Sequence, residues 1–167
     1  NANTSIRYES KTYINFLNAT NSVASSYRIN NVNLGFSGNR YDTLLGGAIS
    51  NGQINLIFGN LDLLSNNPSN YGTYTPSNYF KLSYAGNRTQ TVIPDSSKLL
   101  LSLNGQFANQ NLNSAEQFYL GGPYGVRAYP VAQGNGSQGA QGTIEYQQLL
   151  PREFTGIVFA DAGVVQQ

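Results

Sequence analysis

The chain has 167 residues, a formal net charge of +1 and only 10% charged residues, where a soluble domain usually carries about 25%. So weak a charge excludes a strongly basic surface for nucleic acid. The absence of cysteine and histidine excludes disulfides, the usual nucleophile–histidine pairs and the common zinc and copper sites. We therefore expect no metal, no cofactor, no small-molecule substrate and no enzymatic activity.

Apolar residues recur at every second position along most of the chain, which is the period of a β-strand rather than of a helix. In chain order, this pattern predicts strands at residues 4–15, 27–38, 46–60, 78–92, 96–108, 139–149 and 154–165. The strand at 96–108 is the clearest case, because Leu99, Leu101 and Leu103 fall on one face and Ser102 and Asn104 on the other. The sequence therefore predicts an all-β fold.

The predicted connections alternate between short and long. Short links lie at 40–45, 94–96 and 150–153, long ones at 61–77 and 109–138, and an intermediate one at 16–26. Because alternate turns of an antiparallel meander lie at the same end, one end carries the long loops, as in outer-membrane β-barrels. A soluble β-sandwich is the alternative. Long strands with uncharged polar faces rich in Asn, Ser, Gln and Gly favour the barrel.

Two charged residues stand out because their surroundings are largely apolar. Arg127 lies in the Gly- and Pro-rich stretch 117–130, and Asp161 lies inside the largely apolar strand predicted at 154–165. A carboxylate facing lipid is costly, so Asp161 should face the lumen together with Phe159. A guanidinium can hold a carboxylate by two hydrogen bonds. We therefore expect Arg127 to pair with Asp161, with Phe159 against the guanidinium and Glu145 in support.

The stretch 116–130 resembles the signature loop of two-partner secretion transporters, the TpsB branch of the Omp85 superfamily. It reads Glu-Gln-Phe-Tyr-Leu-Gly-Gly-Pro-Tyr-Gly-Val-Arg-Ala-Tyr-Pro. The strand sequences Gly-Thr-Ile-Glu at 142–145 and Phe-Ala-Asp-Ala-Gly at 159–163 follow it and resemble the next two strands of that family. Further similarities lie upstream in the same order, so the resemblance covers nearly the whole chain.

This resemblance implies an antiparallel transmembrane β-barrel of sixteen strands, with POTRA domains and a plug helix that we do not expect in this chain. Residues 1–167 would be an internal segment of the C-terminal barrel domain, about strands seven to thirteen, whose loop at 109–138 folds into the lumen. The resemblance also implies the site residues, which are the loop-tip motif Val126, Arg127, Ala128 and Tyr129, the loop base Gly121, Gly122 and Pro123, and the barrel-wall partner Asp161. Ala128 stands where the superfamily often has glycine, and alanine disfavours a positive φ.

The function implied by the resemblance is export of a large unfolded partner across the bacterial outer membrane, without nucleotide hydrolysis. The partner would be a TpsA-type exoprotein, such as an adhesin, hemolysin or hemophore, and outer-membrane lipid would surround the barrel. Two alternatives remain, an outer-membrane protein assembly factor of the same superfamily and a soluble β-rich binding or adhesive domain. The Leu-Gly-Gly-Pro sequence before the arginine favours the secretion branch.

Overall fold

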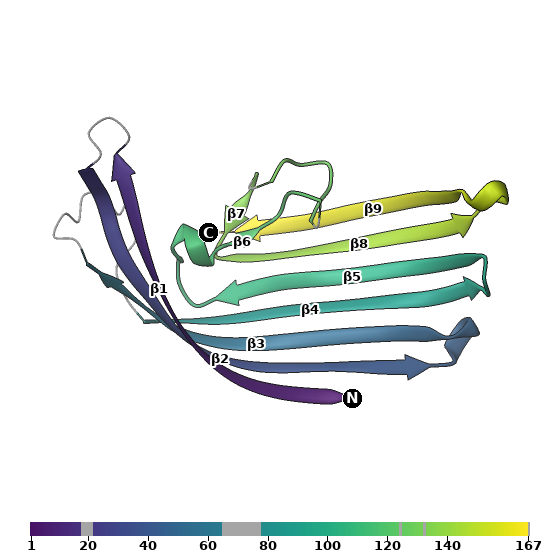
Figure 1. The fold of residues 1–167 in the computed structure, drawn as a ribbon, viewed down its shortest axis with the longest axis horizontal. Helices are drawn as coiled ribbons and strands as arrows, with labels where there is room; N and C mark the ends of the chain where they lie inside the picture. The colour runs from purple at the N-terminus through teal and green to yellow at the C-terminus, as the bar shows by residue number, and fades with distance from the viewer. Residues whose placement is uncertain (18–21, 65–77, 124, 132, 167) are drawn as a thin grey trace.

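The computed structural model describes residues 1–17, 22–64, 78–123, 125–131 and 133–166. Within them, seven antiparallel strands form one sheet in the order β1-β2-β3-β4-β5-β8-β9 (Figure 1). The strands are β1 (Ala2–Leu17), β2 (Ser22–Asp42), β3 (Ala48–Leu63), β4 (Asn78–Ile93), β5 (Ser97–Ala108), β8 (Gln138–Leu149) and β9 (Thr155–Gln166). Helical structure in these ranges is confined to three-residue 3-10 turns, and no helix there is long and apolar enough to cross a bilayer.

The all-β fold and the predicted strands are confirmed, but several predicted bounds are wrong. The strand predicted at 27–38 extends at both ends, because β2 pairs with β1 from Ser22 and with β3 as far as Asp42. The connection predicted at 16–26 is therefore shorter, since β1 continues to Leu17. Backbone pairing with a neighbouring strand extends β2 past the limits of its apolar alternation. Of the loop predicted at 61–77, residues 65–77 lie outside the described residues.

The turns that join β2 to β3, β4 to β5 and β8 to β9 lie at the same end of the sheet, which we call the turn end (Figure 1). The β2–β3 turn contains the 3-10 segment η1 (Leu44–Gly46). The side-chain amide of Gln90, on β4, donates to three carbonyl oxygens of this turn at 2.7, 3.1 and 3.0 Å. Arg88 donates to both carboxylate oxygens of Asp42 at 2.8 and 3.1 Å. These bonds tie the turn to β4.

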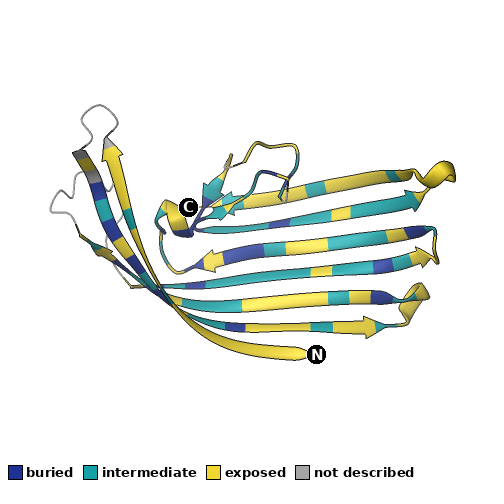
Figure 2. Cartoon of the chain, in the orientation of Figure 1, coloured by how far each residue is buried: buried dark blue, intermediate teal, exposed yellow. Residues whose placement is uncertain are grey.

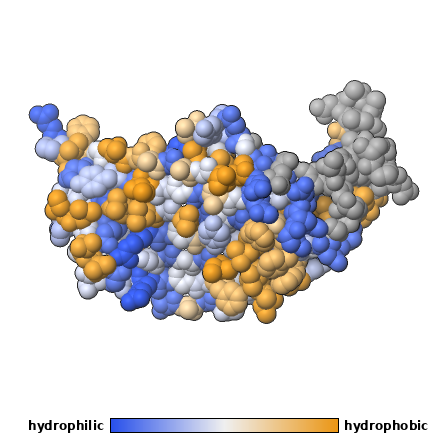
Figure 3. Space-filling view, turned by 180° about the vertical axis from the view of Figure 1, so that it is seen from behind, coloured by the Kyte–Doolittle hydropathy of each residue, from blue (hydrophilic) through white to orange (hydrophobic). Residues whose placement is uncertain are grey.

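The two faces of the sheet differ in chemistry. We call the face that carries Glu145 and Asp161 the inner face and the opposite one the outer face. Few residues of the sheet are buried (Figure 2), and apolar side chains gather in patches on the side of the molecule shown in Figure 3. The strand register places on the outer face the exposed apolar residues Ile6, Tyr8, Val32, Phe36, Ile54, Phe58, Leu103, Phe107, Ile144, Val158 and Val164.

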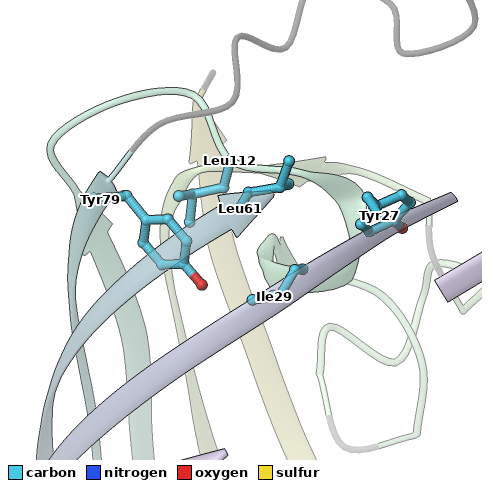
Figure 4. Close-up of a cluster of buried hydrophobic side chains, with 6 residues drawn as sticks. Tyr27, Ile29, Leu61, Tyr79 and Leu112 are labelled. Carbon is cyan, nitrogen blue, oxygen red and sulfur yellow. The ribbon is translucent and has the colours of Figure 1, made fainter. Parts of the chain in front are cut away.

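The buried apolar cluster of the described residues lies on the inner face, at the end opposite to the turns. Figure 4 shows this cluster, with labelled members from β2, β3, β4 and the segment after β5. The cluster comprises Tyr27, Ile29, Leu61, Tyr79, Ala108 and Leu112. Leu112 is only 1% exposed. The segment after β5 is therefore packed against the sheet from its beginning.

Candidate functional site

The described residues of the connection between β5 and β8, 109–123, 125–131 and 133–137, fold back over the inner face, and we call them the loop. It contains the 3-10 turn η3 (Ser114–Glu116) and the short paired strands β6 (Phe118–Tyr119) and β7 (Asn135–Gly136) (Figure 1). A Cβ atom added to Gly139 of β8 would meet the Phe118 ring, and one added to Gly163 of β9 would meet the Leu120 side chain. The loop therefore packs directly on the backbone of β8 and β9.

Residues 120–123 and 125–129 form a compact segment closed by its own backbone hydrogen bonds, which we call the tip. Val126 donates its N–H to the Leu120 carbonyl at 2.9 Å, and Tyr129 donates to the Val126 carbonyl at 3.1 Å. Val126 is 5% exposed, whereas Tyr129 is 49% exposed. Ala128 does not adopt a positive φ, so the alanine costs nothing in backbone strain. The tip is a local unit with Val126 packed inside it.

The loop base requires glycine at two positions. Gly122 has a φ of 108°, a conformation that side chains with a Cβ rarely adopt. A Cβ at Gly121 would collide with the carbonyl oxygen of Pro130. Pro123 follows on the exposed side and lines an open cavity of about 320 Å³ together with Arg127 and Glu145. This chain path directs the following residues toward β8 and β9.

Arg127 is held by three side chains of the inner face. Its Nε and Nη2 donate to the two carboxylate oxygens of Asp161, each at 2.9 Å, and its backbone N–H donates to Asp161 Oδ2 at 3.1 Å. Its Nη1 donates to Glu145 Oε2 at 2.7 Å. The guanidinium carbon lies 3.5 Å from the centroid of the Phe159 ring. The paired hydrogen bonds to Asp161 and the stacking on the Phe159 ring together fix both the position and the plane of the guanidinium.

The two carboxylates are more enclosed than the arginine. The side chains of Asp161, Glu145 and Arg127 are 5%, 15% and 28% exposed. Gln147 donates to Glu145 Oε1 at 2.6 Å, which orients that carboxylate. Hydrogen bonds to Asp161 and then to Glu145 raise the pKa of the Arg127 guanidinium above its usual value, so it stays charged. The arrangement attaches the loop to the sheet, because Arg127 of the loop is bonded to one carboxylate of β8 and one of β9.

The structure brings together four of the residues singled out from the sequence, namely Arg127, Asp161, Glu145 and Phe159. Sequence reasoning missed a second ion pair under the loop, between Lys81 and Glu116. Strand parity places Lys81 on the inner face, but nothing in the loop sequence indicates that Glu116 reaches it. In the described ranges, no group of three or more carboxylate, histidine or cysteine side chains could hold a metal ion.

An antiparallel sheet with an apolar outer face, a polar inner face and a loop clamped to the inner face defines an open section of a β-barrel wall. The family model for haemolysin secretion/activation protein ShlB/FhaC/HecB matches residues 1–167, and the chain belongs to this family. Its members are outer-membrane transporters of two-partner secretion rather than enzymes.

Two curated relatives are similar to the chain at low identity. Both are the heme/hemopexin transporter protein HuxB of Haemophilus influenzae. The protein of strain Rd is 26% identical over 155 residues, and that of strain 86-028NP is 24% identical over 152 residues. Each match covers 87% of this chain and 26% of the relative, so the chain spans about a quarter of these relatives' length. No solved structure matches the chain significantly.

Proposed function

We propose that the chain is a section of an outer-membrane translocator that exports a large unfolded exoprotein by two-partner secretion, without nucleotide hydrolysis. The observation that supports this most strongly is the attachment of Arg127 to Asp161 and Glu145 on a polar face, behind an apolar outer face. An apolar band suits contact with lipid. In this proposal the sheet supplies about strands seven to thirteen of a sixteen-stranded barrel in the bacterial outer membrane.

A row of uncharged hydrogen-bonding groups crosses the middle of the inner face. The strand register aligns Asn39, Asn51, Asn87 and Ser102 across β2 to β5, and Asn51 donates to Asn87 at 2.9 Å. Such a surface can exchange hydrogen bonds with the backbone of a passing chain without trapping side chains of either sign.

The proposed partner follows from the relatives and the family. The two relatives are heme/hemopexin transporter proteins, and the family is that of haemolysin secretion/activation proteins. We therefore propose a secreted TpsA-type exoprotein of the hemophore, adhesin or hemolysin class. Membership of a secretion family also favours export over the assembly of other barrel proteins.

The test uses the full-length protein, expressed with its partner exoprotein in a Gram-negative host. Arg127→Ala and Asp161→Arg should each lower the secreted partner by about tenfold, because each leaves a charge without its counter-ion. The amount of heat-modifiable barrel in the outer membrane should stay unchanged. Arg7→Ala is the matched control, since Arg7 lies on the inner face with a side chain that is 70% exposed.

Normal secretion by both variants would refute the proposal. Unchanged secretion combined with lower levels of other outer-membrane barrel proteins would instead identify an assembly factor.

A further inference from the structure

A second ion pair lies under the loop, away from the tip. Lys81 Nζ is 2.6 Å from Glu116 Oε2, and the two side chains are 9% and 8% exposed. Lys81 is on β4, whereas Glu116 closes the 3-10 turn η3. The Arg127 side chain, by comparison, is 28% exposed. The pair between Lys81 and Glu116 is therefore more buried than the arginine that holds the tip.

Other inner-face side chains complete the hydrogen bonding of Glu116. Lys81 Nζ and Gln106 Nε2 donate to its carbonyl oxygen at 3.2 and 3.0 Å. Asn31 donates to Glu116 Oε1 at 3.3 Å, and Tyr79 donates to the Asn31 side-chain oxygen at 2.7 Å. Buried charges persist where such partners are supplied. Three strands, β2, β4 and β5, thus converge on one loop residue.

The same cluster of side chains also binds the last part of the loop, which leads into β8. Gln106 Nε2 donates to the Ser137 carbonyl at 3.2 Å, and the Leu112 N–H donates to Ser137 Oγ at 2.7 Å. Gln117 Nε2 donates to the Leu112 carbonyl at 3.0 Å. Leu112 and Ser137 are 1% and 2% exposed. The first and last parts of the loop are therefore joined to each other and to the sheet at this cluster. We call its loop residues, Leu112, Glu116, Gln117 and Ser137, the root.

We propose that Lys81 and Glu116 are positioning residues that attach the root of the loop independently of the Arg127 clamp. The root is bonded to β2, β4 and β5, whereas the tip is bonded to β8 and β9. None of the hydrogen bonds described above joins the pair of Lys81 and Glu116 to Arg127 or its two carboxylates. Release of Arg127 then frees the tip, while the residues of the loop that meet at the root remain held. The use of this movement in transport rests on the proposed function, but the attachment at two points does not.

The test measures thiol labelling in outer membranes that contain the full-length protein with a single cysteine. Val126→Cys reports the tip and Ser137→Cys reports the root, because both positions are buried. Glu116→Gln and Lys81→Met should each raise the labelling rate of the root reporter by about tenfold, since each leaves a buried charge unpaired. The tip reporter should change by less than about twofold. Arg127→Ala should give the reverse pattern.

Two controls make the test specific. Glu9→Gln neutralises an inner-face carboxylate that pairs with Lys11 at 2.9 Å but is 34% exposed, and it should change neither rate. The exchange Lys81→Glu with Glu116→Lys should recover part of the protection of the root.

Three results would overturn the proposal. The first is an equal rise in the labelling rates of both reporters in Glu116→Gln or in Lys81→Met. The second is an unchanged labelling rate of the root reporter in these two variants. The third is failure of these variants and of the exchange to insert into the outer membrane. None of them depends on secretion, so failure of the export proposal stays distinguishable.

Discussion

Gly163 is the position where a single methyl group should loosen the tip. It lies on the inner face of β9, two residues after Asp161. A Cβ atom there would overlap the Leu120 side chain and lie 3.0 Å from the Cβ of Gln141. Overpacking of this kind typically costs ~1–3 kcal/mol. A free-energy change of that size would shift the equilibrium between the closed and the open tip by about 5- to 150-fold. Because the Leu120 side chain can rotate away, we expect the lower end, about fivefold.

The assay is the labelling rate of Val126→Cys in full-length protein that contains no other cysteine. The parent should label slowly, because Val126 is 5% exposed, and the rate reports the fraction of molecules with an open tip. Gly163→Ala should raise this rate by about fivefold. Addition of Leu120→Ala should return the rate toward that of the parent, because the overlapping atom has been removed. Coupled substitutions in direct contact are expected to be non-additive in this way.

Gly86→Ala serves as the matched control. Gly86 is on the outer face of β4, where an added Cβ would lie 3.7 Å from the nearest atom, the carbonyl oxygen of Asn51. The labelling rate in this variant should equal that of the parent. The reasoning would be wrong if Gly163→Ala also labelled at the parent rate, or if Leu120→Ala did not reduce the effect.

Two further predictions concern the clamp and the outer face. Arg127→Lys keeps the charge but loses the planar guanidinium that binds two carboxylates. The labelling rate of Val126→Cys should then fall between the rates in the parent and in Arg127→Ala. A rate equal to that of the parent would show that charge alone suffices. Ile144→Arg places a cation on the outer face at a side chain that is 57% exposed, which should cost ~2–4 kcal/mol at the middle of a bilayer and lower the yield of inserted barrel, whereas Ser102→Arg on the inner face should insert normally. Equal insertion of the two variants would contradict a lipid-facing outer face.

The fold was largely predictable because a period of two fixes the side of every residue in a strand. Parity alone places Asp161, Phe159 and Glu145 on one face, and the cost of a carboxylate in hydrocarbon selects the inner face. The loop partner of Asp161 was predictable because Arg127 is a cation among apolar and aromatic residues. The apolar alternation did not mark the ends of β2, since backbone pairing with β1 and β3 extends that strand.

The root was not predictable for a different reason. Lys81 and Glu116 are 35 positions apart in sequence, and their contact depends on how the chain turns after β5. That turn places Leu112 in the buried cluster with Ile29 and Leu61, which come from strands far away in the sequence. Long-range packing of this kind leaves no periodic signal within the loop itself.

The bonds from Gln90 and Arg88 give the turn end a mechanical role. Gln90 holds the β2–β3 turn, and Arg88 joins Asp42 to Gln90, at 2.7 Å from its Nη2 to the Gln90 side-chain oxygen. Three side chains, those of Asp42, Arg88 and Gln90, thus join the β2–β3 turn to β4. If this sheet forms part of a channel wall, any widening of the channel should be smaller at the turn end, where β2, β3 and β4 are joined in this way, than at the opposite end.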